Sequence, residues 1–336
     1  MNTSSPSQPS TPSQPSSSSQ PSAPSRRSLL RTAGLAATVA AVGLAPARSA
    51  VGASRTPDTY TLTITHLDRA GRPTGAYATT VTGLSGPGAA ESVQPYDPSG
   101  TVTVRLPRGR YILDSVLTAS GDGGGTDWIV RPRLDLDRDT TLTVDARTAK
   151  PVDVRPPDRS AALLHAGMFL RITHDGTERF LNQVVNAPTL RVAHLGPAAE
   201  PGSVEQWYDA YWRTGALSYA LGHTVTGSRA VTGLTLRPST QQLATLLVHG
   251  GARSGAPGTA TVDLLPSKGP TVGLAQPLAT PGTATFLLTP ERGTWDVLYT
   301  VRPSTPDGQP TSYRAEGIRV RAGETTTRSF DGAARL

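Results

Sequence analysis

The chain has 336 residues, a formal net charge of +7 and no cysteine. The lack of cysteine excludes disulfides, thiol catalysis and cysteine-ligated zinc. No run of 18 uncharged apolar residues occurs, so we expect no permanent membrane span. The 34 glycines and 30 prolines favour many turns over long helices.

The N-terminal segment has the composition of an export signal. Residues 1–25 are almost entirely Ser, Pro, Gln and Thr, which predicts a disordered tract. Residues 26–47 begin with Arg26-Arg27 and a further arginine at Arg31, continue from residue 32 as an uncharged, mildly apolar stretch and end in Ala45-Pro46-Ala47. This order resembles a twin-arginine signal with a small-residue cleavage site. We therefore expect the twin-arginine translocase and signal peptidase as partners in export, and a secreted protein, cell-wall associated or free.

Export also changes the charge argument. The leader holds three arginines, Arg26, Arg27 and Arg31, and no acidic residue, so its removal lowers the formal net charge from +7 to +4. Spread over the remaining chain, this charge does not indicate nucleic-acid binding and supports at most a weak attraction to an anionic cell wall.

Residues 58–150 show the two-residue period of β-strands. The segment TYTLTITHL at 59–67 alternates threonine with larger side chains. Further strands are expected at 76–84, 91–96, 101–107, 111–119, 127–136 and 140–147. Seven short strands with frequent turns predict a β-sandwich.

Residues 151–336 continue in the same way, and we expect a second all-β sandwich domain. The Asp175-Gly176 pair between two apolar runs predicts a β-hairpin. The Pro-rich stretch 151–160 is the expected domain boundary, and 205–213 could form at most one short helical turn. The predicted fold class is therefore all-β, with two consecutive β-sandwich domains after a disordered leader and a signal peptide.

Four stretches carry resemblances to two families. Residues 97–111 follow a D-x-x-G-x-V-x-V-x-L-P-x-G-x-Y pattern, which resembles transthyretin-like, carboxypeptidase-regulatory-like sandwiches. Residues 139–152, 190–197 and 321–330 are similar to the non-catalytic C-terminal region of large secreted subtilisin-like serine peptidases of high-GC Gram-positive bacteria. The resemblance implies an accessory region whose peptidase domain is absent.

Hydrolase motifs are incomplete. A subtilase serine motif requires a Ser where both Gly-Thr-Ala-Thr runs, 258–261 and 282–285, have none. His249-Gly250-Gly251 resembles an esterase oxyanion loop, but the nearest match to the G-x-S-x-G elbow, 83–87, lacks the last Gly. We therefore expect no enzymatic activity and no catalytic residue.

Metal ligands are also poorly spaced. The six histidines show no H-E-x-x-H pattern and are expected on surfaces and turns, although His165 and His174 could face each other in a hairpin. Asp135, Asp137 and Asp139 alternate and could bind calcium, but a solvated strand end explains them better. We expect no metal and no cofactor.

The best binding candidate is aromatic. Trp207, Tyr208, Tyr211 and Trp212 lie within six residues of a chain that is poor in aromatics. In an extended strand, Tyr208 and Trp212 share one face and Trp207 and Tyr211 share the other. Two roles of this aromatic cluster remain open, packing inside a core and stacking on a glycan. We expect the two tryptophans to act mainly in stability.

The sequence thus predicts a secreted, non-catalytic accessory protein. Its role would be adhesion to a cell-wall polymer or docking with a secreted enzyme such as a peptidase. Two alternatives remain, a glycan-binding module that uses the aromatic cluster and a hydrolase whose site no motif reveals.

Overall fold

The computed structural model describes residues 58–119, 124–251, 258–302 and 309–330. The leader lies outside these residues, so the roles expected for Arg26, Arg27, Ala45 and Ala47 stay sequence predictions. In the described ranges the regular structure is almost entirely β-strand, which confirms the predicted fold class. The helices described are single 3₁₀ turns, η1 (Ala146–Thr148), η2 (Thr240–Gln242) and η4 (Pro290–Arg292). None of the helices in this part of the chain has the length and apolarity needed to cross a membrane.

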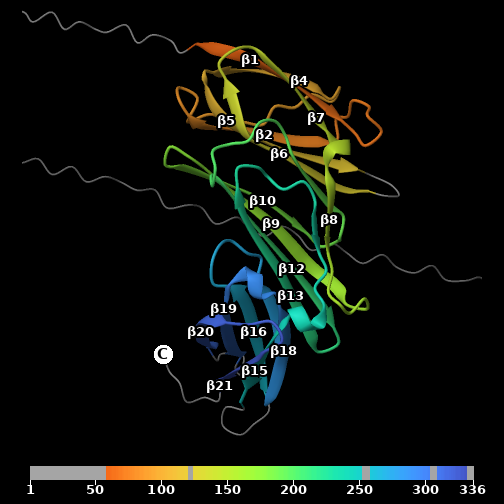
Figure 1. The fold of residues 1–336 in the computed structure, drawn as a ribbon, viewed down its shortest axis with the longest axis vertical. Coiled ribbons are helices and arrows are strands. Elements are labelled where there is room, and N and C mark those ends of the chain that lie inside the picture. Colours follow the sequence, from red (N-terminus) through yellow and green to blue (C-terminus); the bar gives the residue numbers. More distant parts are fainter. Residues whose placement is uncertain (1–57, 120–123, 252–257, 303–308, 331–336) are drawn as a thin grey trace, which may run out of the picture. The chain divides into compact units, whose positions relative to one another are not determined.

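The strands form four sheets, of which the first two hold most of the N-terminal half (Figure 1). Sheet I has the order β4 (Thr101–Pro107), β1 (Thr59–Leu67) and β7 (Thr140–Asp145). Sheet II has the order β14 (Leu234–Leu236), β8 (Lys150–Val154), β11 (Leu190–His194), β6 (Gly125–Leu136), β5 (Gly109–Ala119), β2 (Tyr77–Ser85) and β3 (Ser92–Val93).

Sheets III and IV hold the rest. Sheet III has the order β10 (Thr177–Val185), β9 (Ala162–His174), β12 (Val204–Thr214), β13 (Leu217–Gly227), β18 (Gly282–Leu288), β15 (Ala244–Gly250) and β21 (Thr325–Phe330). Sheet IV has the order β17 (Leu274–Thr280), β16 (Gly258–Pro266), β19 (Thr294–Arg302) and β20 (Thr311–Arg319).

Strand β1 shows how the two-residue period forms a sheet. Leu62 and Ile64 point into the core and are fully buried. The threonines between them face outward, where Thr63 and Thr65 form hydroxyl hydrogen bonds at 3.2 Å to threonines of β4. β-branched side chains fit this pleated, half-buried surface, so the alternation fixes which face of the strand is buried.

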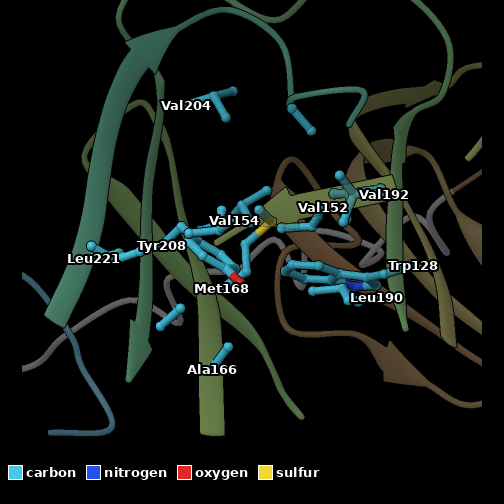
Figure 2. Close-up of a cluster of buried hydrophobic side chains, with 14 of the residues drawn as sticks. Trp128, Val152, Val154, Ala166, Met168, Leu190, Val192, Val204, Tyr208 and Leu221 are labelled. Carbon is cyan, nitrogen blue, oxygen red and sulfur yellow. The ribbon is translucent and has the colours of Figure 1, made fainter. Parts of the chain in front are cut away.

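Three hydrophobic clusters lie between successive sheets. One packs sheet I on sheet II, the second packs sheet II on sheet III, and the third packs sheet III on sheet IV. In the second cluster, Met168 of β9 and Tyr208 of β12 lie close to Val154 of β8 (Figure 2). Sheets II and III are therefore covered on both faces, which explains apolar runs such as those of β9 and β12.

The stretch 151–160, expected as a domain boundary, begins inside strand β8. This strand and β14 pair in parallel, and β11 pairs in parallel with β6. Strands from both sides of residue 150 therefore complete sheet II. The division into domains 58–150 and 151–336 stays a prediction about independent folding.

Other local expectations were corrected by the structure. Residues 205–213 form no helical turn, because they belong to strand β12, which pairs with both β9 and β13. The expected strand 91–96 is reduced to β3, and strands β8, β17 and β21 were not predicted. The Asp175-Gly176 hairpin is confirmed, with φ of 48° and 75° at the two turn residues.

Candidate functional site

The four aromatic candidates are core residues of strand β12. The exposed fractions of Trp207, Tyr208, Tyr211 and Trp212 are 5%, 6%, 0% and 8%. Tyr208 and Trp212 pack in the cluster between sheets II and III, whereas Tyr211 packs between sheets III and IV. The predicted alternation of faces is confirmed, and the burial favours the packing interpretation over an exposed stacking platform.

Two further contacts hold Trp207. The guanidinium carbon of Arg171 lies 5.5 Å from the centroid of the indole ring, a distance suited to a cation–π contact. The backbone at Gly269 comes so close that an added Cβ would lie 2.4 Å from the indole nitrogen. Trp207 is therefore enclosed by protein and offers no face to a sugar.

Trp212 differs from the other three because its side chain reaches the wall of a cavity. This cavity has a volume of about 500 Å³ and is open to solvent. Its lining comes from the β8–β9 loop, the loop after β10, strand β12 and the end of β14, and comprises Arg155, Pro156, Pro157, Asp158, Arg159, Ala161, Pro188, Trp212, Arg237 and Pro238. We call it the arginine pocket.

Strand pairing places the arginines of this pocket together. Because β14 runs parallel to β8, the ends of the two strands meet, and the backbone N–H of Arg155 donates to the carbonyl of Leu236 at 3.0 Å. Arg155 and Arg237 both donate to Asp153, the first at 2.8 Å. The four lining prolines give the mouth a rigid backbone, since each fixes its own φ.

The pocket has a positive balance. Burial alone would raise the pKa of Asp153, but hydrogen bonds from Arg237 and Arg155 outweigh it and hold the pKa below the usual range. The hydroxyl and backbone N–H of Ser160 likewise lower the pKa of Asp158. Arg159 is exposed and has no ion pair within the described part of the chain. The pocket lining therefore carries three guanidinium groups and one carboxylate, Asp158, whereas Asp153 lies outside the lining.

One histidine is a core residue, contrary to the surface location expected for all six. His66 has no exposed surface and stacks on Tyr77 with ring centroids 3.5 Å apart. Its Nδ1 donates to the carbonyl of Gly100, so Nε2 accepts from Thr79, which in turn accepts from Ser115. Burial lowers the pKa of His66 to about 4 and keeps the ring neutral.

The chain from Ser115 to His66 does not form a nucleophilic site. Ser115 and Thr79 are 0% and 3% exposed, so no substrate reaches either hydroxyl in this conformation. A hydroxyl next to a histidine is required for a serine nucleophile, but access is required as well. The arrangement satisfies buried polar groups between sheets I and II.

The candidate metal ligands are separated. His165 and His174 do not face each other, because both lie on β9, where His165 donates to the carbonyl of Gly273 and His174 contacts Arg110. Asp135 pairs with Arg110 and Arg133, while Asp139 accepts from the backbone N–H of Thr61. Over the described ranges no three His, Asp or Glu side chains form a metal-type group.

The His-Gly-Gly segment is part of a sheet. His249 and Gly250 lie in β15 and pair with β18 and β21. The N–H of Gly251 donates to the carbonyl of Phe330, so this backbone group is already used. The segment resembles an esterase oxyanion loop in sequence, but it does not form the loop geometry that an oxyanion hole requires.

A buried ion pair joins sheets III and IV. Arg292 of η4 donates to both carboxylate oxygens of Asp209 on β12, at 2.7 and 3.3 Å, and both side chains are 1% exposed. The remaining guanidinium hydrogens bind the carbonyls of Lys268 and Pro270. Burial raises the pKa of Asp209, and the bonds from Arg292 oppose this. The pair is satisfied and closed, which is typical of a structural role.

Comparisons with known proteins assign no family. No family model and no curated protein matches the chain. Among solved structures, the Bacillus anthracis TIE protein is 12% identical over 81% of this chain and 50% of its own, with a TM-score of 0.19. The chain thus spans half the length of that protein.

Two pilins are similarly distant. The major pilin subunit BcpA of Bacillus cereus is 9% identical over 81% of this chain and 99% of its own, with a TM-score of 0.18. A streptococcal ancillary pilin is 9% identical over 81% of this chain and 99% of its own, with a TM-score of 0.16. These scores are too low to carry an argument about function.

The sequence reasoning missed the arginine pocket. Its parts lie in four separate segments, and only the parallel pairing of β8 with β14 brings Arg155 beside Arg237. The R-P-P-D-R motif at 155–159 lies in the stretch that the sequence indicates as a domain boundary. Five Arg-Pro pairs occur in the chain, including those at 155–156 and 237–238, so the motif alone does not reveal the pocket.

Proposed function

We propose that this protein is an exported, non-catalytic β-sandwich module that binds an anionic polymer outside the cell through the arginine pocket. The observation that carries the proposal is the pocket itself, about 500 Å³ in volume, with Arg155, Arg159 and Arg237 on its lining. Guanidinium groups bind carboxylate and phosphate oxygens in a fork geometry. Carboxylate or phosphate groups on a surface polysaccharide or wall polymer are the chemistry that fits.

The charges on and next to the pocket lining favour an acidic ligand over a neutral one. Asp153 is already shared by two arginines, and Asp158 is held by Ser160. Arg159 remains as the exposed cation without a partner in the described residues. An incoming anion would therefore form an ion pair with Arg159. It would also contact the guanidinium groups of Arg155 and Arg237 on the sides that face away from Asp153.

The absence of catalysis is part of the same proposal. Two deeply buried polar pairs, Asp209 with Arg292 and His66 with Thr79, are closed structural contacts. The pocket lining offers arginines, prolines and one held aspartate, without a histidine or an activated hydroxyl. Such a site can bind and orient an anion but holds no group suited to proton transfer at neutral pH.

The proposal is tested by binding to polymers of known charge. Mature protein would be sedimented with insoluble polygalacturonate, with poly(glycerol phosphate) immobilised on beads, and with neutral dextran beads. We expect binding to the two anionic supports, little binding to dextran, and loss of binding in the variant Arg155→Gln/Arg159→Gln/Arg237→Gln. Equal binding to dextran, or unchanged binding of the triple variant, would refute the pocket as the site.

A further inference from the structure

The free edge of sheet III at strand β10 has an unusual surface. Strand β10 ends the strand order of this sheet, and its side chains alternate in exposure along all nine residues. The odd-numbered residues Leu181 and Val185 pack on the cluster between sheets II and III. The even-numbered residues face outward, and among them Phe180 and Val184 are 60% and 50% exposed.

Several other edge strands in the described residues carry features that hinder pairing with another strand. Edge strand β17 carries Pro277, edge strand β4 carries Arg105 and ends at Pro107, and β14 and β3 have three and two residues. Short strands, prolines and charges prevent edge-to-edge pairing. Strand β10 carries charges only near its start, at Glu178 and Arg179, whereas residues 180–185 are uncharged and include no proline, and its pairing with β9 has no bulge. It therefore leaves a regular row of backbone donors and acceptors next to exposed apolar side chains.

We propose that β10 pairs antiparallel with β10 of a second copy of this chain, around a two-fold axis at Asn182. Side chains on one face must stay on that face across the new pair, so even-numbered residues must lie opposite even-numbered residues. With the axis at Asn182, Phe180 lies opposite Val184 of the partner subunit, and the reverse pair forms on the other side of the axis. Both exposed apolar residues are then covered by each other.

Neighbouring registers are less complementary. An axis at Leu181 places Val184 opposite the partner's Glu178, so that an apolar side chain meets a carboxylate. An axis at Phe180 leaves Val184 beyond the paired segment. The Asn182 register keeps Glu178 and Arg179 away from like charges and sets two amides face to face, which can hydrogen-bond to each other.

The dimer would change the avidity of the protein for a polymer without creating a new kind of ligand site. Pro188 of the arginine pocket follows β10 by three residues, so the two-fold pair carries two pockets. Two sites on one particle raise the avidity for a repeating polymer. The pairing of β10 is nevertheless independent of the ligand, since it rests only on the edge strand.

The test uses the lack of cysteine in the chain. A single Asn182→Cys substitution places two thiols opposite each other at the axis, whereas two Glu178→Cys thiols would lie about 27 Å apart, since a strand rises about 3.4 Å per residue. We expect a short bis-maleimide linker to convert Asn182→Cys protein to a covalent dimer at micromolar concentration and to leave Glu178→Cys protein monomeric. Equal cross-linking of both variants, or of neither, would overturn the proposal.

A second measurement does not depend on added thiols. Sedimentation velocity of the unmodified mature chain should show a dimer, and Asn182→Asp should shift it to monomer because two carboxylates then face each other at the axis. Asn182→Ser should keep the dimer, and all three proteins should have the same melting temperature when measured as monomers at high dilution. A monomeric wild-type protein at 100 µM would contradict the inference.

Discussion

Burial of the β12 tryptophans defines their role at the scale of single residues. Trp207 and Trp212 are both more than nine-tenths buried, and each pairs across to strand β13. Replacing either with alanine should cost about 3–5 kcal/mol of unfolding free energy, through lost burial and the cavity left behind. Urea unfolding measures the loss, and Tyr96→Ala, at a residue 59% exposed, is the matched control that should cost little. Tryptophan variants with the wild-type urea midpoint would contradict this assignment.

His66 gives the fold a dependence on pH. Its pKa is about 4 in the folded protein, below the ordinary histidine value of 6.5, so the unfolded chain binds a proton first as pH falls. Stability from the neutral ring is fully present above pH 6.5 and is lost progressively from pH 6.5 to pH 4. The charged or polar groups around the ring are the carbonyl of Gly100 and the hydroxyl of Thr79, and neither titrates in this range.

The His66 effect is isolated by comparison with a variant that does not titrate. The difference in unfolding free energy between wild type and His66→Gln should shrink as pH is lowered from 7 to 4, because only the wild type loses the contribution of the neutral ring. Carboxylates elsewhere titrate in both proteins and cancel in the difference. A difference that stays constant over this range would show that His66 does not set the pH dependence.

Residue patterns explain why some sites were predictable and others were not. The alternation of Thr with Leu and Ile at 59–67 gave β1 with its observed bounds, and the aromatic alternation of β12 gave the correct faces. The arginine pocket was not predictable, because Arg155 and Arg237 meet only after β8, which ends at Val154, and β14, which begins at Leu234, pair in parallel. Local spacing carries no information on such long-range parallel pairing.

At the scale of elements, sheet II decides whether the N-terminal sandwich can fold alone. Leu84, Ile112, Trp128 and Val130 belong to residues 58–150, yet they pack in the cluster shared with sheet III. A fragment that ends at residue 149 would lack β8, β11 and β14 and expose this apolar face. We expect fragment 58–149 to aggregate or to unfold without a sharp transition, whereas the chain 58–336 unfolds cooperatively. A soluble fragment with a sharp urea transition by far-UV circular dichroism would instead support two independent domains.

Elements with mixed signals are the hardest to assign from the sequence. The prolines of the stretch 151–160 indicate a domain boundary, which stays a prediction, and the first residues of the stretch belong to β8, a strand whose partners come from residues 190–194 and 234–236. Residues 205–213 carry no clear two-residue period because both faces of β12 are buried, between sheets II and IV. Tertiary covering on both faces removes the alternation that identifies a half-exposed strand.

At the scale of the whole molecule, the proposed function depends on export. We expect Arg26 and Arg27 to direct the chain through the twin-arginine pathway, since that receptor recognises guanidinium groups and not charge alone. The variant Arg26→Lys/Arg27→Lys should accumulate inside the cell with its leader intact, and secretion should fall at least tenfold by immunoblot of the medium. Unimpaired secretion would indicate the general secretory pathway.

The central claim is that the arginine pocket binds an anionic polymer, and a pair of charge-matched variants tests it most directly. Arg155→Gln/Arg159→Gln/Arg237→Gln removes three positive charges from the pocket, and Arg108→Gln/Arg138→Gln/Arg319→Gln removes three from exposed sites elsewhere. The measurement is the dissociation constant for poly(glycerol phosphate) at 150 mM salt. We predict at least a tenfold weakening for the pocket variant, about 1.4 kcal/mol, and less than twofold for the control variant. Equal weakening of the two variants would show that net charge, and not the pocket, accounts for binding.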